Sequence, residues 1–259
     1  MPLVRHPRPS ATDADLAASL TDRVVLALRE RLLRGEYRAG SRLTELGLVA
    51  DVGASRTPVR HALVRLAHEG LLETLPRGGF RVRAFTVPEI WDAIEVRGVL
   101  EGTAARLAAE RLDDPRDLDS LRALITRMDR LVPGDVDAFV QYLDLNDAFH
   151  AELRRLARSP MLMRALDVVL LLPFAAPGAL VFSQAESAHS ARASIIAQEH
   201  HRAIVEAITL REGTRAESLA REHARLARQN LARALGDRHL FNLLPGSSLI
   251  TLPQSASFA

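Results

Sequence analysis

The feature that most constrains this chain is the order of secondary-structure signals in its first third. Apolar residues recur there at helical spacing, and Gly35 and Gly53 interrupt the pattern twice. A turn of four residues, Pro76-Arg77-Gly78-Gly79, then separates two short segments that alternate between apolar and polar side chains. These signals predict three helices followed by a β-hairpin, over residues 16–34, 44–51, 55–69, 71–75 and 80–85.

Every convincing segment after Pro88 is helical, which predicts a mainly α protein without a further sheet. The predicted helices cover residues 88–112, 115–131, 135–158, 160–172, 186–211 and 214–235. We therefore expect an N-terminal winged helix-turn-helix followed by an all-α antiparallel helical bundle. The expected divisions are a disordered leader (1–14), a winged helix-turn-helix domain (15–86), the bundle (87–236) and an unassigned C-terminal tail (237–259).

Composition narrows the classes of function. The chain has no cysteine, which excludes disulfides, thiolate zinc sites and cysteine nucleophiles. The first 85 residues hold 14 arginines against 9 acidic residues, whereas the remainder is mildly acidic, so a polyanion is expected to bind near the N-terminus. The first residues do not form a secretory signal, and prolines break the longest uncharged stretch. These observations favour a cytoplasmic protein without a membrane partner.

The third predicted helix combines a buried stripe with a polar first turn. Val59, Leu63 and Leu66 lie on one face, which turns Arg56 and Arg60 away from the core. Arginine side chains can bond to guanine edges in the major groove, while hydroxyl groups and a helix N-terminus bind phosphates. An isolated helix of this kind is more often a solvated face, but the basic charge and the neighbouring elements favour DNA binding. The candidate DNA-binding residues include Ser55, Arg56, Thr57 and Arg60 of the helix, and Arg77 and Gly78 of the hairpin.

Three histidines lie on apolar helix faces in the second half, at positions 150, 201 and 223. His201 precedes the turn at Gly213 by about as many residues as His223 follows it, so an antiparallel helix pair would bring the two level. Asn146 shares the face of His150. A single histidine in such a place is usually a core residue, but three that meet could hold a divalent ion such as zinc.

Arg97 also lies on an apolar helix face, four residues before Glu101. The simpler interpretation is an i,i+4 ion pair, and the functional one is a clamp for a carboxylate. The stretch from Leu170 to Phe182 departs from helical periodicity, and its apolar residues are candidates for capping a pocket.

Two regions resemble a known family. The first resembles the GntR family of bacterial regulators at Gly40-Ser41-Arg42-Leu43, Ser55-Arg56-Thr57-Pro58-Val59-Arg60 and Glu69-Gly70-Leu71. The second resembles the FCD effector domain of the FadR-type branch at Val96-Arg97, Leu100-Glu101, Asn146-Asp147-Ala148-Phe149-His150, His201-Arg202-Ala203-Ile204, Ala220 and His223.

The resemblance implies a homodimeric repressor that binds a pseudo-palindromic operator and responds to a small organic acid bound by Arg97. It adds Arg42 to the DNA-binding positions. It also implies a metal held by an aspartate and three histidines, although Asn146 here replaces that aspartate. No catalytic residue is expected. The alternatives are a three-histidine metalloenzyme and an architectural DNA-binding protein with a degenerate effector domain; the first lacks a hydrolase motif, and an effector response would exclude the second.

Overall fold

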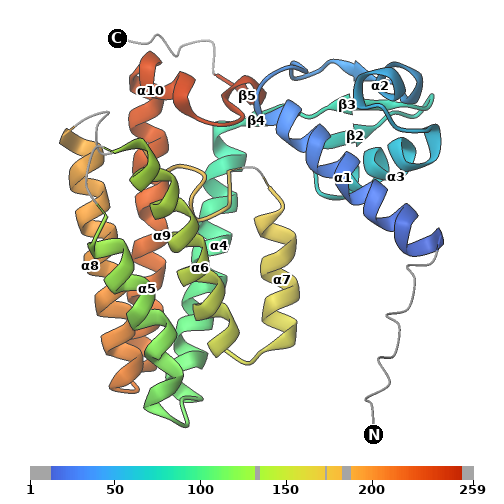
Figure 1. The fold of residues 1–259 in the computed structure, drawn as a ribbon. Helices are drawn as coiled ribbons and strands as arrows, with labels where there is room; N and C mark the ends of the chain where they lie inside the picture. The colour runs from blue at the N-terminus through green and yellow to red at the C-terminus, as the bar shows by residue number, and fades with distance from the viewer. Residues whose placement is uncertain (1–12, 132–134, 173, 183–187, 253–259) are drawn as a thin grey trace, which may run out of the picture. The chain divides into compact units, whose positions relative to one another are not determined.

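The computed structural model describes residues 13–131, 135–172, 174–182 and 188–252. The chain divides into two compact units, Met1–Ala84 and Phe85–Ala259. Most of the predicted leader lies outside the described residues, but the first helix already begins at Asp13. Figure 1 shows the helices and strands of both units.

The first unit is built on three helices, as the sequence predicts. They are α1 (Asp13–Leu33), α2 (Glu45–Val52) and α3 (Arg56–His68). The predicted apolar stripes of α1 and α3 are buried, and the two helices pack against each other. Thr44 caps α2 by accepting a hydrogen bond from the backbone N–H of Gly47. Ser55 occupies the N-cap position of α3, but its hydroxyl makes no capping bond.

A small antiparallel sheet completes this unit. Its strands are β1 (Arg42–Leu43), β2 (Leu72–Thr74) and β3 (Phe80–Val82), in the order β1-β3-β2. The sequence predicts the hairpin of β2 and β3 but not β1, because a two-residue strand carries no periodicity of its own. Both hairpin strands are shorter than expected, and Phe85 belongs instead to a strand of the second unit.

The second unit is helical, as predicted. Its long helices are α4 (Val87–Glu110), α5 (Asp119–Asp129), α6 (Val136–Leu156), α7 (Pro160–Leu170), α8 (Ala188–Thr209) and α9 (Gly213–Gly236). A 3-10 turn, η1 (Pro115–Leu118), precedes α5 where a single helix was expected. Thr86 and Glu89 form a capping box that begins α4. Among the described residues, no helix combines the length and the apolar character needed to cross a membrane.

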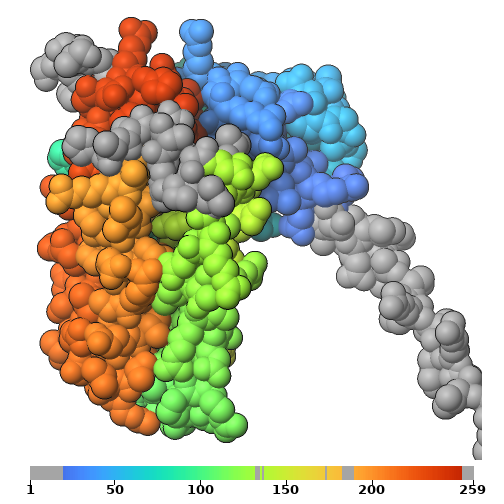
Figure 2. All heavy atoms as spheres, turned by 60° about the vertical axis from the view of Figure 1, so that its left-hand side comes forward, coloured from blue at the N-terminus to red at the C-terminus, as the bar shows by residue number. Residues whose placement is uncertain are grey.

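Helices α4 and α9 approach each other closely. A Cβ atom on Gly102 would lie 3.0 Å from the backbone oxygen of Glu217, and one on Gly98 would lie 3.1 Å from the Cβ of Ala224. Glycine at these two positions therefore permits the contact. Figure 2 shows α8 and α9, in orange and red, side by side on one face of this unit.

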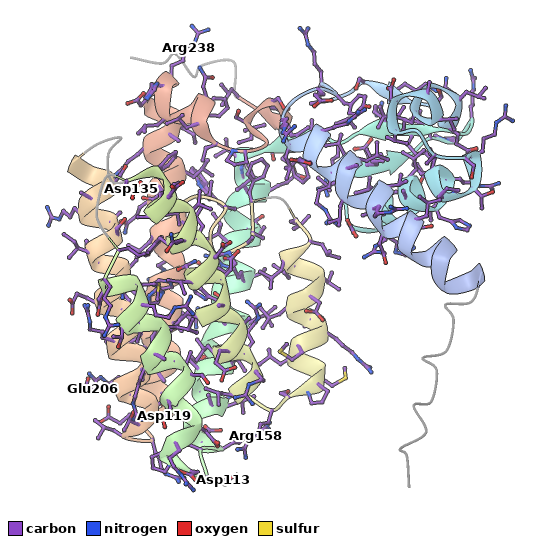
Figure 3. All side chains as sticks on the ribbon, viewed as in Figure 1. Asp113, Asp119, Asp135, Arg158, Glu206 and Arg238 are labelled. Atoms are coloured by element: carbon purple, nitrogen blue, oxygen red, sulfur yellow. The ribbon has the colours of Figure 1, made fainter. Side chains whose placement is uncertain are left out.

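Ion pairs connect the loops at one end of the bundle. Arg158, which follows α6 with a φ of 47°, forms ion pairs with Asp113 and Asp117. Figure 3 shows Asp113 and Arg158 at this end of the unit. The turn from α6 to α7 is thereby held against the turn that follows α4.

The C-terminal segment carries structure that the sequence left unassigned. It contains α10 (Arg238–Leu243), the 3-10 turn η2 (Ser247–Leu249) and β5 (Ile250–Thr251). Strand β5 pairs in parallel with β4 (Phe85–Thr86), and Leu249 is fully buried. Residues 237–252 therefore belong to the second unit and do not extend from it as a separate tail. Residues 253–259 lie outside the described part.

Candidate functional sites

The first turn of α3 is exposed, as expected for a DNA-reading helix. Ser55, Arg56, Thr57 and Arg60 are exposed, whereas Pro58 and Val59 are buried. Among the described residues, Arg60 has one ion-pair partner, Glu45, at 3.7 Å between Nε and Oε1. Because this pair is long and open to solvent, it holds Arg60 weakly. DNA contact by these residues remains a prediction.

Arg42, which the family resemblance adds to the DNA-binding positions, holds the hairpin tip. Arg42 donates a hydrogen bond from one terminal nitrogen to the backbone oxygen of Gly78, at 3.0 Å. Gly78 and Gly79 have φ values of 83° and 86°, a region that glycine adopts without strain. Arg77 is exposed at the same tip. Arg42 therefore positions the wing, while Arg77 makes no such structural bond with the described residues.

The three predicted histidines meet inside the second unit. His150 lies on α6, His201 on α8 and His223 on α9, and all three are buried. One ring nitrogen of each lies within 4.8 Å of the others. The Nε2 atoms of His150 and His223 are 3.2 Å apart. The expected convergence of three imidazoles is therefore present, and the binding of a metal remains a prediction.

The spacing of these nitrogens fits a shared ion. Two imidazole ligands of a tetrahedral zinc ion, each about 2.0–2.1 Å from the metal, lie about 3.3 Å apart. The buried Nε2 of His201 has no hydrogen-bond partner among the described residues. Buried nitrogen atoms without partners are costly unless something binds them. Burial lowers the pKa of His201 and of His223 well below 6.5, so both rings are neutral and can act as ligands.

Two further side chains orient the imidazoles. Glu101 on α4 places Oε1 3.2 Å from Nδ1 of His150. The side-chain oxygen of Gln198 lies 3.0 Å from Nδ1 of His201. A proton on Nδ1 of His201, shared with Gln198, would leave Nε2 of that ring free to bind a metal, and Glu101 places a negative charge beside His150. The sequence did not identify either role, although Gln198 lies three residues before His201 on the same helix.

Glu101 is the buried negative charge of this cluster. Its Oε2 lies 3.6 Å from Nε of Arg97, and its Oε1 lies 3.6 Å from a terminal nitrogen of Arg154. Burial alone would raise the pKa of Glu101, but its interactions with His150, Arg97 and Arg154 outweigh burial and lower that pKa to about 2. The carboxylate is therefore ionised at neutral pH.

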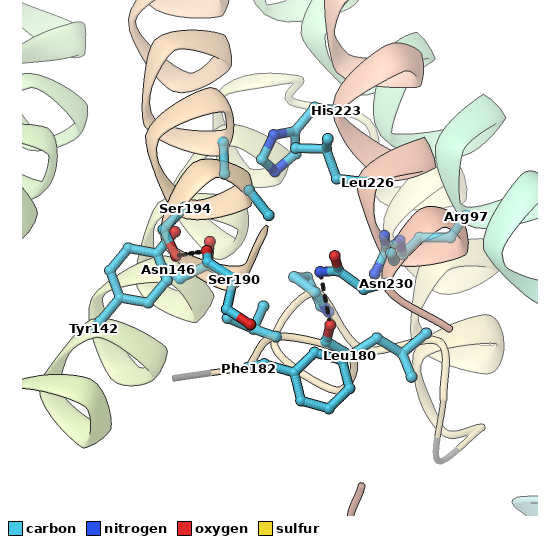
Figure 4. A pocket seen from close by; sticks show the side chains of 15 residues that line it. Arg97, Tyr142, Asn146, Leu180, Phe182, Ser190, Ser194, His223, Leu226 and Asn230 are labelled. Carbon is cyan, nitrogen blue, oxygen red and sulfur yellow. Dashed lines mark hydrogen bonds between the residues drawn. The ribbon is translucent and has the colours of Figure 1, made fainter. Parts of the chain in front are cut away.

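A cavity of about 40 Å³ adjoins the cluster. Arg97, Asn146 and His223 line it, and Figure 4 shows these side chains around the space together with Tyr142. By the usual volume of a buried water, it has room for about three such molecules. Burial raises the pKa of Tyr142 to about 12, so its hydroxyl remains protonated.

Arg97 forms the ion pair of the simpler interpretation, and its role as a clamp for a carboxylate remains a prediction. It forms the expected contact with Glu101, and both side chains are only 2% exposed. Its two terminal nitrogens also donate to the backbone oxygens of Ala175, at 2.9 Å, and Ala224, at 3.4 Å. Each terminal nitrogen carries a second N–H group, and the side chain also lines the cavity.

The segment after α7 lies against this cavity. Leu180 and Phe182 line it, and the backbone oxygen of Leu180 accepts a hydrogen bond from Asn230 at 2.9 Å. Phe174 is buried and contacts Phe85 edge to face, with ring centroids 5.7 Å apart. Residues 174–182 therefore connect the cavity wall to the first residue of the second unit.

Comparisons with known proteins agree on the two units. The gntR family of bacterial regulatory proteins matches residues 20–82, and the FCD domain matches residues 92–226. The Nta operon transcriptional regulator of Aminobacter aminovorans is 35% identical over 130 residues, which cover 50% of this chain and 60% of that protein. A protein described as a probable D-xylose utilization operon transcriptional repressor, from Paenarthrobacter nicotinovorans, is 28% identical over 82% of this chain and 87% of its own.

A solved structure has a similar fold. The McbR/YncC protein of Escherichia coli superposes with a TM-score of 0.57 and 24% identity, covering 83% of this chain and 96% of that one. At this level of identity the likeness concerns the fold.

Proposed function

Since the chain belongs to the GntR family of bacterial regulatory proteins and carries an FCD domain, we propose that it is a ligand-responsive repressor. Its family and relatives make it a transcriptional regulator and not an enzyme. In the proposal, a homodimer binds a pseudo-palindromic operator through α3 of each copy. A small carboxylic acid bound beside the histidine cluster lowers that affinity. The repressor named among the relatives supports the direction of control.

The observation that carries DNA binding is the exposed first turn of α3, with Arg56 and Arg60 beside a helix N-terminus. Replacing either arginine by alanine is expected to weaken specific operator binding by about 1–3 kcal/mol, at one fixed salt concentration. Arg65→Ala is the matched control, because Arg65 lies on the same helix and pairs with Asp22 and Glu69. Gel-shift titrations that show equal losses for all three variants would refute this assignment.

Two helices of the second unit support a homodimer. Val96 and Val99 on α4 are 48% and 38% exposed, and Met161 and Val168 on α7 are 70% and 68% exposed. Helices α4 and α7 pack against each other, so these apolar side chains suit contact with a second copy. Val168→Glu is expected to shift sedimentation from dimer to monomer. A wild-type monomer that protects one asymmetric half-site would contradict the proposed dimer.

The histidine cluster is proposed to hold one divalent ion, zinc by preference, with Asn146 beside it. A bound ion would act as a Lewis acid that anchors a carboxylate. Elemental analysis of the purified chain should find about one ion per chain, and His201→Ala should lose it. His68→Ala, outside the cluster, should retain it. No metal in the wild-type chain, together with an intact ligand response after chelation, would contradict the metal site.

The route from the cavity to the DNA-binding unit is proposed to begin at residues 174–182. Arg97 binds the backbone of Ala175, and the adjacent Phe174 contacts Phe85. A ligand that draws Arg97 toward itself weakens its bond to Ala175 and shifts Phe174 against Phe85. A ligand changes the affinity for the operator only if its contacts differ between the two states of the protein. Operator binding that stays constant over a screen of small acids would refute ligand control and favour an architectural role.

A further inference from the structure

The connection between the two units is short, because both of its ends are held. On one side, the backbone N–H of Arg83 donates a hydrogen bond to the backbone oxygen of Leu71 in the first unit, at 3.0 Å. On the other side, Phe85 is 3% exposed and already belongs to β4 of the second unit. Ala84 is exposed and lies between these two anchors. A single residue spans at most about 3.6 Å, so little free chain separates the two units.

The C-terminal segment, residues 237–252, holds the second of these anchors. Its strand β5 pairs in parallel with β4, which places Ile250 opposite Phe85. Leu249, one residue earlier, is fully buried, so the segment is itself fixed in the second unit. The segment lies beyond residues 92–226, the part of the chain that the FCD domain matches. It is therefore an addition to the matched domain, and it acts on the residue at which the second unit begins.

Loss of this pairing would lengthen the free connection. Thr86 would stay bound to α4 through its capping box with Glu89, so the backbone of Phe85 is the part that would be released. Phe85 would keep the contact of its ring with Phe174, but its backbone would no longer be paired. One more free residue adds at most about 3.6 Å in each copy, or about 7 Å in a dimer. Since one base pair advances the DNA by about 3.4 Å, this length covers a change of about two base pairs between half-sites.

We propose that the C-terminal segment determines which half-site spacing the dimer accepts, by holding β4 where the chain enters the second unit. This inference rests on the homodimer of the proposed function and adds an element that selects its operator. A dimer gains affinity from its second half-site only where the geometry allows both copies to bind together. A held connection restricts this to one spacing, whereas a released connection permits the neighbouring spacings.

The test uses double-stranded DNA that the wild-type full chain selects from a randomised pool. The two half-sites are then moved apart by one or two inserted base pairs, and fluorescence anisotropy measures each affinity at one fixed salt concentration. Each insertion should cost the wild-type chain about tenfold or more, because the advantage of two linked sites is lost when both cannot be bound together. A DNA with a single half-site measures binding by one copy of α3.

Thr251→Pro is the decisive variant. Thr251 is exposed and pairs with Thr86, so proline removes a backbone N–H from the paired strand without emptying a buried site. Ile250 already has a φ of −87° and a ψ of 124°, in the extended region that suits a residue before proline. One inserted base pair should cost this variant less than about threefold, and its affinity for the single half-site should equal that of wild type.

Two further variants complete the experiment. Thr251→Ala is the matched control, because it changes the same exposed side chain but keeps the N–H, and it should behave as wild type. Ile250→Ser weakens the same anchor through a side chain that is 8% exposed, and it should relax the dependence on spacing as Thr251→Pro does. All three variants should sediment as the wild-type dimer.

The outcomes separate this inference from the proposed function. If Thr251→Pro and Ile250→Ser keep the wild-type dependence on spacing, the segment has no such role. An equal loss on every DNA, the single half-site included, would also overturn the inference, because it would show general destabilisation. A wild-type dimer that binds all spacings equally would overturn the inference and leave DNA binding intact. Failure to select any DNA, or a wild-type monomer, would overturn the proposed function together with it.

Discussion

Replacing Glu101 by glutamine removes the one buried negative charge that contacts His150 and leaves the shape of the side chain nearly unchanged. Arg97 and Glu101 are each 2% exposed, so bulk water solvates neither charge when its partner is removed. Removing one partner of a buried ion pair typically costs about 3–5 kcal/mol. We therefore expect Glu101→Gln to lower the free energy of unfolding of the second unit by several kcal/mol.

The pKa of Glu101 gives an independent magnitude. A fall from 4.5 to about 2 on folding corresponds to about 3 kcal/mol, at about 1.4 kcal/mol for each pH unit. Because the pKa is lower in the folded state, this contribution is fully present above about pH 4.5 and is lost as the pH falls toward 2. The difference in stability between wild type and Glu101→Gln should therefore shrink across this window.

The chain provides its own probe and control for this measurement. Trp91 is the single tryptophan and lies on α4, so urea unfolding followed by its fluorescence, with a chelator present, reports on the second unit. Glu110→Gln is the matched control, because Glu110 pairs with Arg106 at the same i,i+4 spacing but is 48% exposed. Its loss should be about 0.5 kcal/mol or less. Equal losses for the two variants would refute the role of Glu101 as counter-charge.

Three further substitutions probe the second unit by the same assay. Gly102→Ala should destabilise it by about 1–3 kcal/mol, because the added methyl group meets the backbone of α9. The control is Gly236→Ala, which should not destabilise it by crowding, because no atom lies within 4 Å of the added methyl group. Phe174→Ala should cost about 3–5 kcal/mol, since it empties a site that is only 2% exposed; a loss below 1 kcal/mol would contradict tight packing on Phe85. Thr86→Ala should cost about 1 kcal/mol by removing the capping box, and no change would show that α4 begins without it.

The sequence alone determined the order and kind of most elements, because helical periodicity and turn residues act over a few neighbouring positions. It also predicted that the first turn of α3 is exposed, since Val59, Leu63 and Leu66 occupy the opposite face. The meeting of His201 and His223 followed from one local feature, the turn at Gly213, which folds two regular helices back on each other.

Only the tertiary structure decided the features that join distant parts of the chain. The pairing of β4 with β5 brings Phe85 beside Ile250. A two-residue strand is too short for its sequence to predict which strand it pairs with. Glu101 is a case of the same kind: the sequence shows its helical neighbour Arg97, but its contact with His150 depends on how α4 packs against α6. Spacing along one helix specifies which residues share a face, whereas the depth and rotation of packed helices specify which atoms meet.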